Sequence, residues 1–305
     1  LSSSMTSPID VLTVELPQNK KIDRSKIKKG DKIEWHAGYR ESGLIKEFEG
    51  EIFSISPKLP LEIVAKDYMY NLQGINLKNS LNKKTLKSFL KEYVSGNMEI
   101  KVDPLIENEK FSIKKGYRRS VVWTLLQLKK QKKVQSFFKG RTLHLQDPFK
   151  KFTAGTIAGL ELDEFGDAYK IIEDNLQVQE EVETRIIVNS YNAKRGILYK
   201  GKYGESSWKR QKEYDIDGLS SNSECNKKAK KLYQETAGNS LLGSFTTFGY
   251  PSVSHSKFVK IKSIEEPTKN KNVFVKKVEK TFDAANATYR QIVHVGLISF
   301  KQENR

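Results

Sequence analysis

Apolar and polar residues alternate in short runs through the first third of the chain, and Gly, Ser and Pro interrupt these runs. Alternation with a period of two is typical of half-buried strands, so the pattern predicts antiparallel strands that form a small barrel. The predicted strands lie within residues 9–16, 32–36, 52–55 and 61–65. The residues LSSS before Met5 are interpreted as a remnant of processing outside the fold, which gives a first β-barrel domain over residues 5–75.

A helical spacing replaces the alternation after residue 75. Apolar side chains recur three and four residues apart between residues 83 and 94, which predicts an amphipathic helix, and Gly96 follows where a left-handed cap is expected. Strand-like segments come next, and Ser120 occupies the position of a helix cap before a second apolar helical run. Two such units predict an α/β insertion domain over residues 76–150.

The remainder of the chain returns to strand-like alternation. Part of residues 153–182 is expected to complete the first barrel, and residues 183–305 are expected to form a second β-barrel domain. Ser221 and Glu224 have the spacing of a capping box, which predicts a helix at about 222–238 within this second barrel. The predicted fold class is therefore α+β, mostly β, with two small antiparallel β-barrel domains and an α/β insertion.

The order of these elements, together with several short motifs, resembles the baseplate hub proteins of contractile phage tails. The motifs are Phe48 and Gly50 at the entry to a strand, Asp67 at the start of a helix, and Gly249 and Pro251 in a Gly-x-Pro turn. The family is the late control protein D and tail hub group, whose fold is shared by the hub part of type VI secretion spikes. The resemblance covers most of the chain, with departures at residues 254–257, where many relatives carry a glycine-containing turn, and at the short link of residues 153–166.

The family resemblance implies a homotrimer whose two barrels per subunit form a pseudo-sixfold ring that joins a sixfold tail tube to a threefold spike. The implied partners are other copies of the chain, the tail tube protein, the baseplate wedge proteins and a spike made as a separate polypeptide, because no spike-like barrel and β-helix follow before Arg305. DNA or a tape-measure segment is expected to pass transiently through the central channel. The resemblance also implies synthesis in the bacterial cytoplasm and incorporation into the baseplate of a virion or tail-like particle.

A strong positive charge is the main compositional feature, because 54 Lys and Arg residues against 37 Asp and Glu residues give a net charge of +17. Lysine clusters at residues 129–133 and 227–231 are typical either of solvated helix surfaces or of a phosphate-binding face. No motif for sequence-specific nucleic-acid binding accompanies them. The single cysteine, Cys225, can form no internal disulfide, and the apolar runs are too short to span a bilayer, so no membrane insertion is expected.

Candidate catalytic chemistry is sparse. The four histidines are far apart, and no zinc-protease, serine-hydrolase or P-loop spacing occurs, so no catalytic residue, metal or cofactor is expected. A tail-tip cell-wall hydrolase or peptidoglycan-binding module is an alternative, for which carboxylates between residues 163 and 181 could form a catalytic pair. A basic nucleic-acid-binding protein is a further alternative.

An exposed contact surface is predicted in the polar segment between residues 199 and 214. Trp208 stands beside Lys209 and Arg210 there, and Tyr203 lies nearby in the sequence. Trp, Tyr and Arg side chains are enriched at the centres of protein interfaces. These four residues are therefore predicted to contact a partner.

Overall fold

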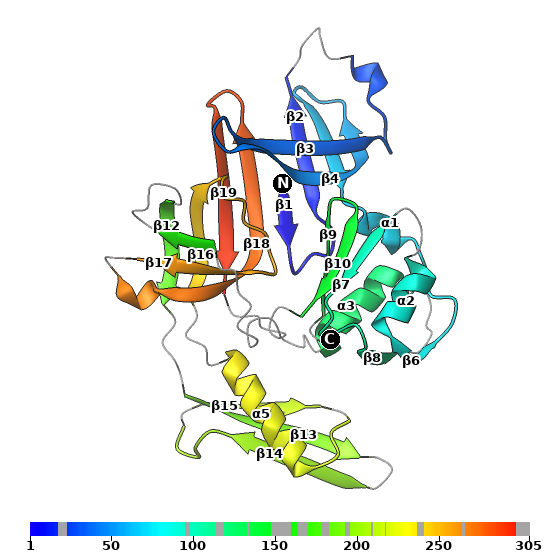
Figure 1. The fold of residues 1–305 in the computed structure, drawn as a ribbon, viewed down its shortest axis with the longest axis vertical. Coiled ribbons are helices and arrows are strands. Elements are labelled where there is room, and N and C mark those ends of the chain that lie inside the picture. The colour runs from blue at the N-terminus through cyan, green and yellow to red at the C-terminus, as the bar shows by residue number, and fades with distance from the viewer. Residues whose placement is uncertain are drawn as a thin grey trace. The chain divides into compact units, whose positions relative to one another are not determined.

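The computed structural model describes residues 1–17, 23–94, 98–113, 119–132, 134–147, 160–163, 170–178, 183–192, 196–208, 210–216, 218–236, 241–263 and 266–296 (Figure 1). The chain divides into two units. Among the described residues, the first contains those within Leu1–Asp174 and Ser244–His294, and the second contains those within Asn175–Gly243 and residues 295–296. The predicted fold class is confirmed, because the structure is mostly β with curled sheets and carries an α/β insertion.

The largest element is an 11-stranded sheet whose main path has the strand order β12-β16-β19-β18-β1-β2-β5-β4-β3. Its remaining two strands lie off this path, where β11 pairs with β17 and β17 pairs with β18. The strand bounds are β1 Ser2–Ser4, β2 Val11–Leu16, β3 Lys32–Tyr39, β4 Gly43–Ser56, β5 Leu61–Lys66, β11 Leu160–Asp163, β12 Ile171–Val178, β16 Leu241–Phe248, β17 Phe258–Lys262, β18 Lys271–Asp283 and β19 Thr288–Val295. Strands from the N-terminal and C-terminal parts of the chain thus share one hydrogen-bonded sheet.

Strand β1 connects these two parts. Ser3 lies opposite Val278 of β18 in antiparallel register, and Ser2 also lies opposite Val11 of β2. The backbone N–H of Lys280 donates to the carbonyl of Leu1 over 2.8 Å. The expectation that LSSS lies outside the fold is therefore wrong. A run of serines shows no apolar alternation that would predict a strand. Its backbone groups nevertheless pair with the edges of both neighbouring strands.

The segment between residues 153 and 182 pairs differently from the sequence expectation. Among its described residues, β11 pairs in parallel with β17, and β12 borders β16 at the end of the sheet. These strands therefore extend the C-terminal part of the sheet rather than completing the first barrel. Alternation predicts a strand but not its partner, because register and pairing depend on distant residues.

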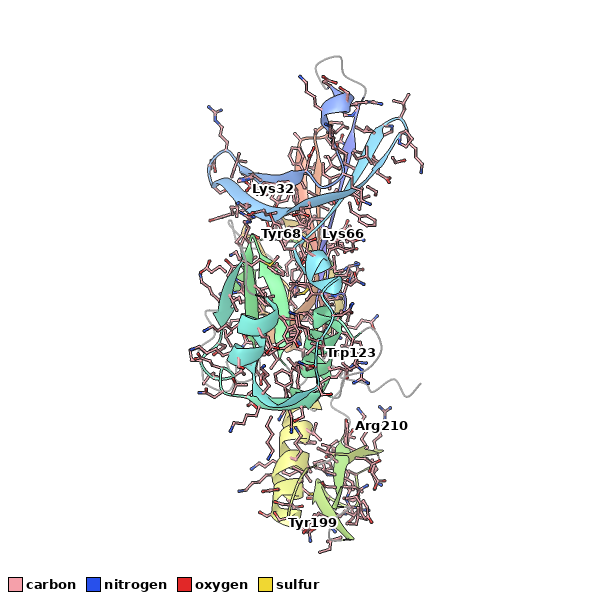
Figure 2. The ribbon with its side chains drawn as sticks, turned by 90° about the vertical axis from the view of Figure 1, so that its right-hand side faces the viewer. Lys32, Lys66, Tyr68, Trp123, Tyr199 and Arg210 are labelled. Atoms are coloured by element: carbon pink, nitrogen blue, oxygen red, sulfur yellow. The ribbon has the colours of Figure 1, made fainter. Side chains whose placement is uncertain are left out.

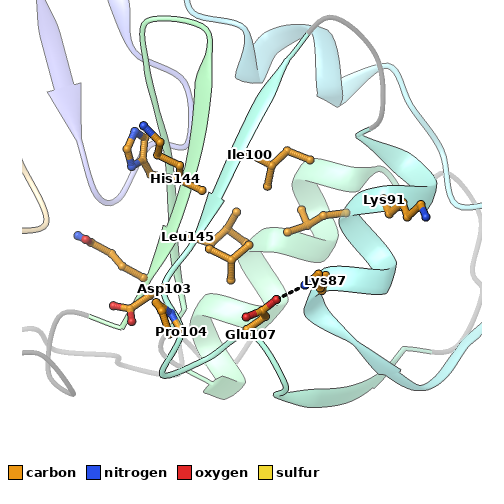
Figure 3. A pocket seen from close by; sticks show the side chains of 12 residues that line it. Lys87, Lys91, Ile100, Asp103, Pro104, Glu107, His144 and Leu145 are labelled. Carbon is orange, nitrogen blue, oxygen red and sulfur yellow. Dashed lines mark hydrogen bonds and ion pairs between the residues drawn. The ribbon is translucent and has the colours of Figure 1, made fainter.

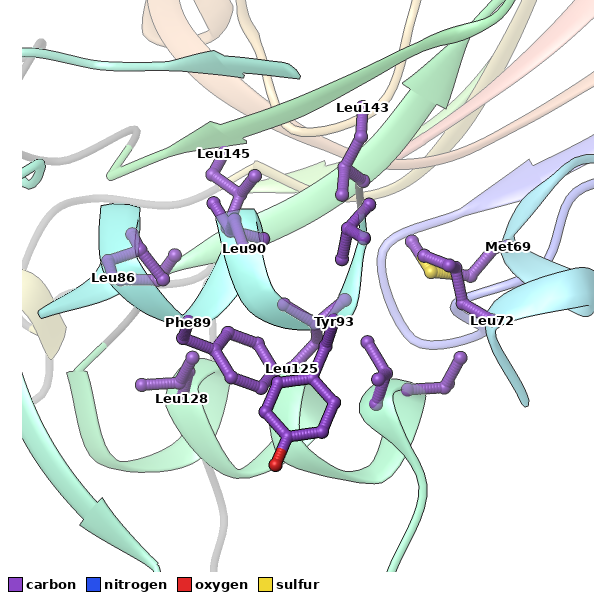
Figure 4. Packing of buried hydrophobic residues seen from close by; sticks show 14 of the residues in the cluster. Met69, Leu72, Leu86, Phe89, Leu90, Tyr93, Leu125, Leu128, Leu143 and Leu145 are labelled. Carbon is purple, nitrogen blue, oxygen red and sulfur yellow. The ribbon is translucent and has the colours of Figure 1, made fainter. Parts of the chain in front are cut away.

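The α/β insertion has its own core. Its three-stranded sheet has the order β7-β10-β9, and β6 pairs with β8. The bounds are α1 Met69–Gln73, β6 Leu81–Thr85, α2 Leu86–Tyr93, β7 Glu99–Val102, β8 Lys110–Ile113, α3 Val121–Lys132, β9 Gln135–Lys139 and β10 Thr142–Gln146. Figure 4 shows the buried side chains of α2, α3 and β10, including Phe89, Leu90, Leu125 and Leu143, packed against one another.

Helix α2 begins later than the helical spacing predicts. Residues 81–85 pair with β8 instead, and the Thr85 hydroxyl accepts a hydrogen bond from the Ser88 N–H over 3.3 Å, which caps the helix. The expected cap at Gly96 lies outside the described residues. Helix α3 has the predicted cap, because the Ser120 hydroxyl accepts from the Trp123 N–H over 3.1 Å.

The second unit contains a separate sheet with the order β14-β13-β15, covered by a helix. The bounds are β13 Thr184–Asn192, β14 Ile197–Tyr203, β15 Arg210–Asp215 and α5 Asn222–Thr236. The stretch expected to start the second barrel thus forms its own layer, with β13 and β15 in parallel. Cys225 and Ala229 of α5 are fully buried against Val188 of β13, which explains why the sole cysteine is inaccessible.

The predicted helix forms and the Ser221 cap is present, but the Glu224 carboxylate binds the N–H of Ser220, the residue before the cap, rather than that of Ser221. The Glu224 N–H donates to the Ser221 hydroxyl over 3.2 Å, and the Glu224 carboxylate accepts from the Ser220 N–H over 2.7 Å. Together these contacts satisfy backbone donors at the start of α5. In the part of the chain that the structure describes, no helix is long and apolar enough to cross a membrane.

The Ser120 cap gives a direct stability test of the insertion. The Ser120→Ala variant is expected to lose about 1 kcal/mol of unfolding free energy, because the Trp123 N–H loses its acceptor. The matched control is Ser88→Ala on the exposed face of α2, expected to change stability by less than about 0.5 kcal/mol. Urea denaturation measures both, and equal stabilities for the two variants would contradict the cap.

Candidate functional site

A β-bulge in β4 places a carboxylate inside the molecule. Trp35 of β3 lies opposite Phe48, but the next residue, His36, lies opposite Lys46, so Glu47 is an extra residue in β4. A bulge changes the direction in which the side chain of the inserted residue points. The Glu47 side chain is consequently only 5% exposed, although it stands next to Phe48, which is itself buried.

Lys280 of β18 meets this carboxylate. Its side chain is 4% exposed, and its ammonium forms an ion pair with Glu47 and donates to the Ser252 hydroxyl over 2.6 Å. Ser252 and the Tyr289 hydroxyl also donate to Glu47, over 3.0 and 2.9 Å. Burial lowers the pKa of Lys280, and Glu47 opposes this shift, while burial beside Glu47 raises the pKa of Tyr289. Both carboxylate oxygens therefore have partners, which is the condition under which a buried pair is tolerated.

Aromatic and backbone contacts surround this ion pair, and two of the motif residues lie among them. Tyr39 of β3 donates its hydroxyl hydrogen to the carbonyl of Tyr289 over 2.6 Å and accepts from the Gly249 N–H over 3.2 Å. The Gln291 side-chain amide donates to the carbonyls of Phe248 and Pro251 over 2.8 and 2.7 Å. We call Glu47, Lys280, Tyr289 and these surrounding contacts the junction, because it joins β3 and β4 to β18 and β19.

The motif residues have packing roles. A Cβ atom on Gly249 would lie 2.1 Å from the Tyr289 ring, and one on Gly50 would lie 2.2 Å from the carbonyl oxygen of Lys66. Only glycine permits such close approach. Asp67 is 5% exposed, and its carboxylate accepts from the Met69 N–H over 3.2 Å at the start of α1.

A second buried cluster lies around Asp10. Its carboxylate accepts from the Ser3 hydroxyl over 2.7 Å and lies 4.0 Å from Nε2 of His255. The Asp67 N–H donates to the Asp10 carbonyl over 3.1 Å. Burial raises the pKa of Asp10 to about 7 and, with repulsion from Asp10, raises that of Asp67. Burial lowers the pKa of His255 to about 4, with Lys129 contributing.

The α/β insertion contacts this cluster. The Lys129 ammonium of α3 donates to the Met5 carbonyl, and burial lowers its pKa to about 8. The Phe137 ring of β9 packs edge-on against His255 with ring centroids 5.3 Å apart, and the Gln146 amide of β10 donates to the Ser256 carbonyl over 3.0 Å. We call Asp10, Asp67 and His255, with these contacts, the seat of the insertion.

A cavity of about 880 Å³ lies between α2 and the β7 edge of the insertion sheet (Figure 3). Its lining includes the apolar side chains of Ile100 and Leu145 and the basic side chain of Lys91. The Lys87 ammonium is paired with the Glu107 carboxylate. The lining holds no arrangement of nucleophile and base, so no catalytic chemistry is assigned to it.

The predicted contact residues lie in the second unit. The Tyr203 and Trp208 rings both pack against Tyr233 of α5, with centroids 4.9 and 5.1 Å apart, and both are half-buried rather than freely exposed. Arg210, labelled in Figure 2, is exposed at the start of β15, and Lys209 lies outside the described residues. A role of these residues in partner contact stays a prediction.

The described residues contain no cluster of three or more His, Cys, Asp or Glu side chains that could hold a metal ion. The histidines make ordinary contacts. His294 lies 3.0 Å from Glu279, His36 lies 2.9 Å from Glu34, and the His144 ring stacks on Phe137.

Sequence reasoning singled out Asp67 but missed the other charged residues of the two clusters. Lys280 stands two residues after the apolar Val278 in an alternating strand, which is a usable signal of an inward-facing lysine. Glu47 gives no such signal, because only the bulge brings it inside. His255 falls in the segment where the chain departs from the family pattern, and this departure was the available pointer.

Removing one partner of the junction pair tests its energetics. Lys280→Met is expected to cost about 3–5 kcal/mol of unfolding free energy, because Glu47 is left buried without a counter-charge. The matched double variant, Glu47→Gln with Lys280→Met, removes both charges and keeps an acceptor for Tyr289, so it is expected to recover at least half of the loss. Urea denaturation that finds the double variant no more stable than the single one would contradict a buried pair.

The close approach at Gly249 gives a second test. Gly249→Ala is expected to cost about 1–3 kcal/mol, because the added methyl group overlaps the Tyr289 ring. Gly74→Ala is the control, since its Cβ would meet only the Asn71 carbonyl oxygen at 3.7 Å. Thermal denaturation that shows the two alanine variants to be equally stable would show that the ring moves away without cost.

Comparison with known proteins adds the final observation. No protein-family model and no curated protein match the chain. A 43 kDa tail protein of prophage MuSo2 from Shewanella oneidensis matches 96% of this chain and 92% of its own length at 15% identity and a TM-score of 0.63. A tail protein from Neisseria meningitidis MC58 matches 98% of this chain and 91% of its own length at 11% identity and a TM-score of 0.63.

A type VI secretion component from E. coli, described as structurally similar to T4 bacteriophage tail proteins gp27 and gp5, is also similar. It matches 96% of this chain and 74% of its own length, at 12% identity and a TM-score of 0.50. Identities this low show the fold alone. The expected likeness is thus confirmed at the level of fold: this chain has the fold of phage tail proteins and of a type VI secretion component.

Proposed function

We propose that this protein is a structural, non-enzymatic component of a contractile phage tail or tail-like particle, and that it acts there as the baseplate hub. The observation that carries this proposal is the likeness to two phage tail proteins over 96% and 98% of the chain. The likeness extends through the insertion and the second unit as well as the large sheet. A shared barrel alone would support a much wider range of functions.

A hub must keep one arrangement of its strands while other proteins bind to it. The junction supports this role, because a buried charged network that is fully hydrogen-bonded fixes one arrangement of the strands that carry it. Tyr39, Glu47, Lys280 and Tyr289 come from four different strands. Any sliding of β4 against β18 would leave buried charges without partners.

The proposed assembly is a homotrimer that joins the sixfold tail tube to a threefold spike, with the spike as a separate polypeptide and wedge proteins around it. The likeness to a type VI secretion component that is itself compared with T4 tail proteins gp27 and gp5 supports tail-component partners. The net charge of +17 suits a channel through which DNA or an acidic tape-measure segment passes, because lysines attract phosphates and carboxylates through long-range, salt-sensitive forces.

The solution mass tests the trimer. Light scattering at several protein concentrations and at low and high salt is expected to give three times the chain mass of 35.0 kDa. High salt is expected to leave the trimer intact while it abolishes any DNA binding, because phosphate contacts are screened. A monomer at every concentration that binds DNA tightly at low salt would contradict the hub and favour a basic nucleic-acid-binding protein.

A further inference from the structure

Strand β7 lies at the edge of the insertion sheet. Among the described residues it pairs only with β10, in parallel register with Val102 opposite Leu145. The Asp103 N–H continues this ladder, because it donates to the Leu145 carbonyl over 2.9 Å. Successive residues of a strand direct their backbone groups to opposite edges, so the N–H and C=O groups of Ile100 and Val102 point away from β10. Backbone groups on such an edge can pair with a further strand.

The cavity of about 880 Å³ runs along this edge (Figure 3). Ile100 and Val102 line it from the face of β7 that packs on the insertion core, and Lys101 lines it from the opposite face. A hollow that is lined from both faces of one strand includes the backbone edge between them. Helix α2 contributes Leu90 and Lys91 to the lining. An extended peptide can bind in such a position by adding a strand to the sheet, with alternate side chains on either face.

The face of β7 toward α2 is apolar. Ile100 and Val102 are half-buried, and they pack against the core that contains Leu90 and Leu145. All four of these residues line the cavity. Every second side chain of an added strand points to this face, where apolar groups are removed from water. Apolar residues are therefore favoured at these positions of the added strand.

The opposite face of β7 is basic. Lys101 lies opposite His144 of β10, and its side chain is 62% exposed. Burial lowers the pKa of His144, and the nearby charges of Lys101 and Lys139 lower it further. The Glu99 carboxylate lies 3.4 Å from the Lys101 ammonium, but its side chain is also 60% exposed, and an exposed pair of this kind is weak. A carboxylate from an added strand can therefore bind Lys101 in its place.

The acids in the lining have contacts within the chain. The Glu107 carboxylate pairs with Lys87, and the Asp103 carboxylate accepts from the Leu105 N–H over 3.1 Å. Lys91 is exposed on α2 and supplies a second basic side chain beside the edge. In a chain of net charge +17, this lining favours an occupant with negative charge.

We propose that β7 is a docking edge for an extended segment of a partner protein in which apolar and acidic residues alternate. The segment adds a strand beside β7, and its backbone forms hydrogen bonds with Ile100 and Val102. Its apolar side chains pack on the face toward α2, and its acidic side chains face Lys101, while Lys91 attracts them from α2. This docking edge belongs to the insertion and is independent of the hub role proposed above.

A synthetic peptide tests the docking edge on the full chain. The probe is a short peptide of alternating glutamate and valine with blocked ends and a fluorescent label, and its binding is measured by fluorescence anisotropy. Saturable binding with a Kd below about 1 mM is expected, together with slower hydrogen exchange in residues 98–103. The same peptide methylated on every backbone nitrogen is expected to bind at least about tenfold more weakly, because it cannot donate hydrogen bonds to β7.

Paired lysine variants test the contribution of charge. Lys91→Glu with Lys101→Glu places two acids beside the edge and is expected to weaken binding of the probe about tenfold. The control, Lys110→Glu with Lys130→Glu, changes two exposed lysines outside the cavity lining and alters the net charge equally. It is expected to change binding less than about twofold. Circular dichroism checks that both variants are folded.

Four results would each overturn the docking edge. They are absence of binding by the alternating peptide at about 1 mM, equal binding by its methylated form, equal weakening by both lysine pairs, and protection from exchange confined to another strand edge such as β14.

Discussion

The buried ion pair between Glu47 and Lys280 is the interaction on which the arrangement of the large sheet depends. Both side chains are about 5% exposed or less, and each has further hydrogen-bond partners in Ser252 or Tyr289. A pair of this kind contributes little net stability compared with apolar residues, but it strongly penalises any arrangement that separates the charges. It therefore selects one geometry for strands that are more than 200 residues apart in the sequence.

Two other features build on this geometry. Strand β1 lies between β18 and β2, so the backbone hydrogen bonds of the sheet continue across the place where the N-terminal and C-terminal parts meet. The α/β insertion has its own apolar core and contacts this region through the seat around Asp10 and His255 and through the ion pair of Arg141 with Glu49 of β4. The first unit thus combines a buried polar junction within the large sheet with a second buried polar contact that attaches the insertion.

The sequence predicts local elements well and long-range pairing poorly, for physical reasons. The spacing of Leu86, Phe89, Leu90 and Tyr93 correctly predicted helix α2, because the hydrogen bonds of a helix join residues that are close in the sequence. The partners of β11 and β12 could not be read in this way, since strands find their neighbours through distant contacts. For the site, the glycine and aspartate motifs predicted that Gly249 and Asp67 have structural roles. The bulge that buries Glu47 leaves no trace in the alternation of apolar and polar residues. Trp208 was expected to be exposed because its sequence neighbours are polar, but its ring packs against Tyr233.

The central claim is that this chain is a threefold structural component of a tail baseplate. Electron microscopy of the purified protein, alone and mixed with tail tube and spike proteins of the same particle, tests this claim most directly. The expected result is end-on views with threefold symmetry around an open axial channel, in which each copy contributes two sheet layers to a ring. Single copies without symmetry in both preparations, or a ring closed at its centre, would contradict it.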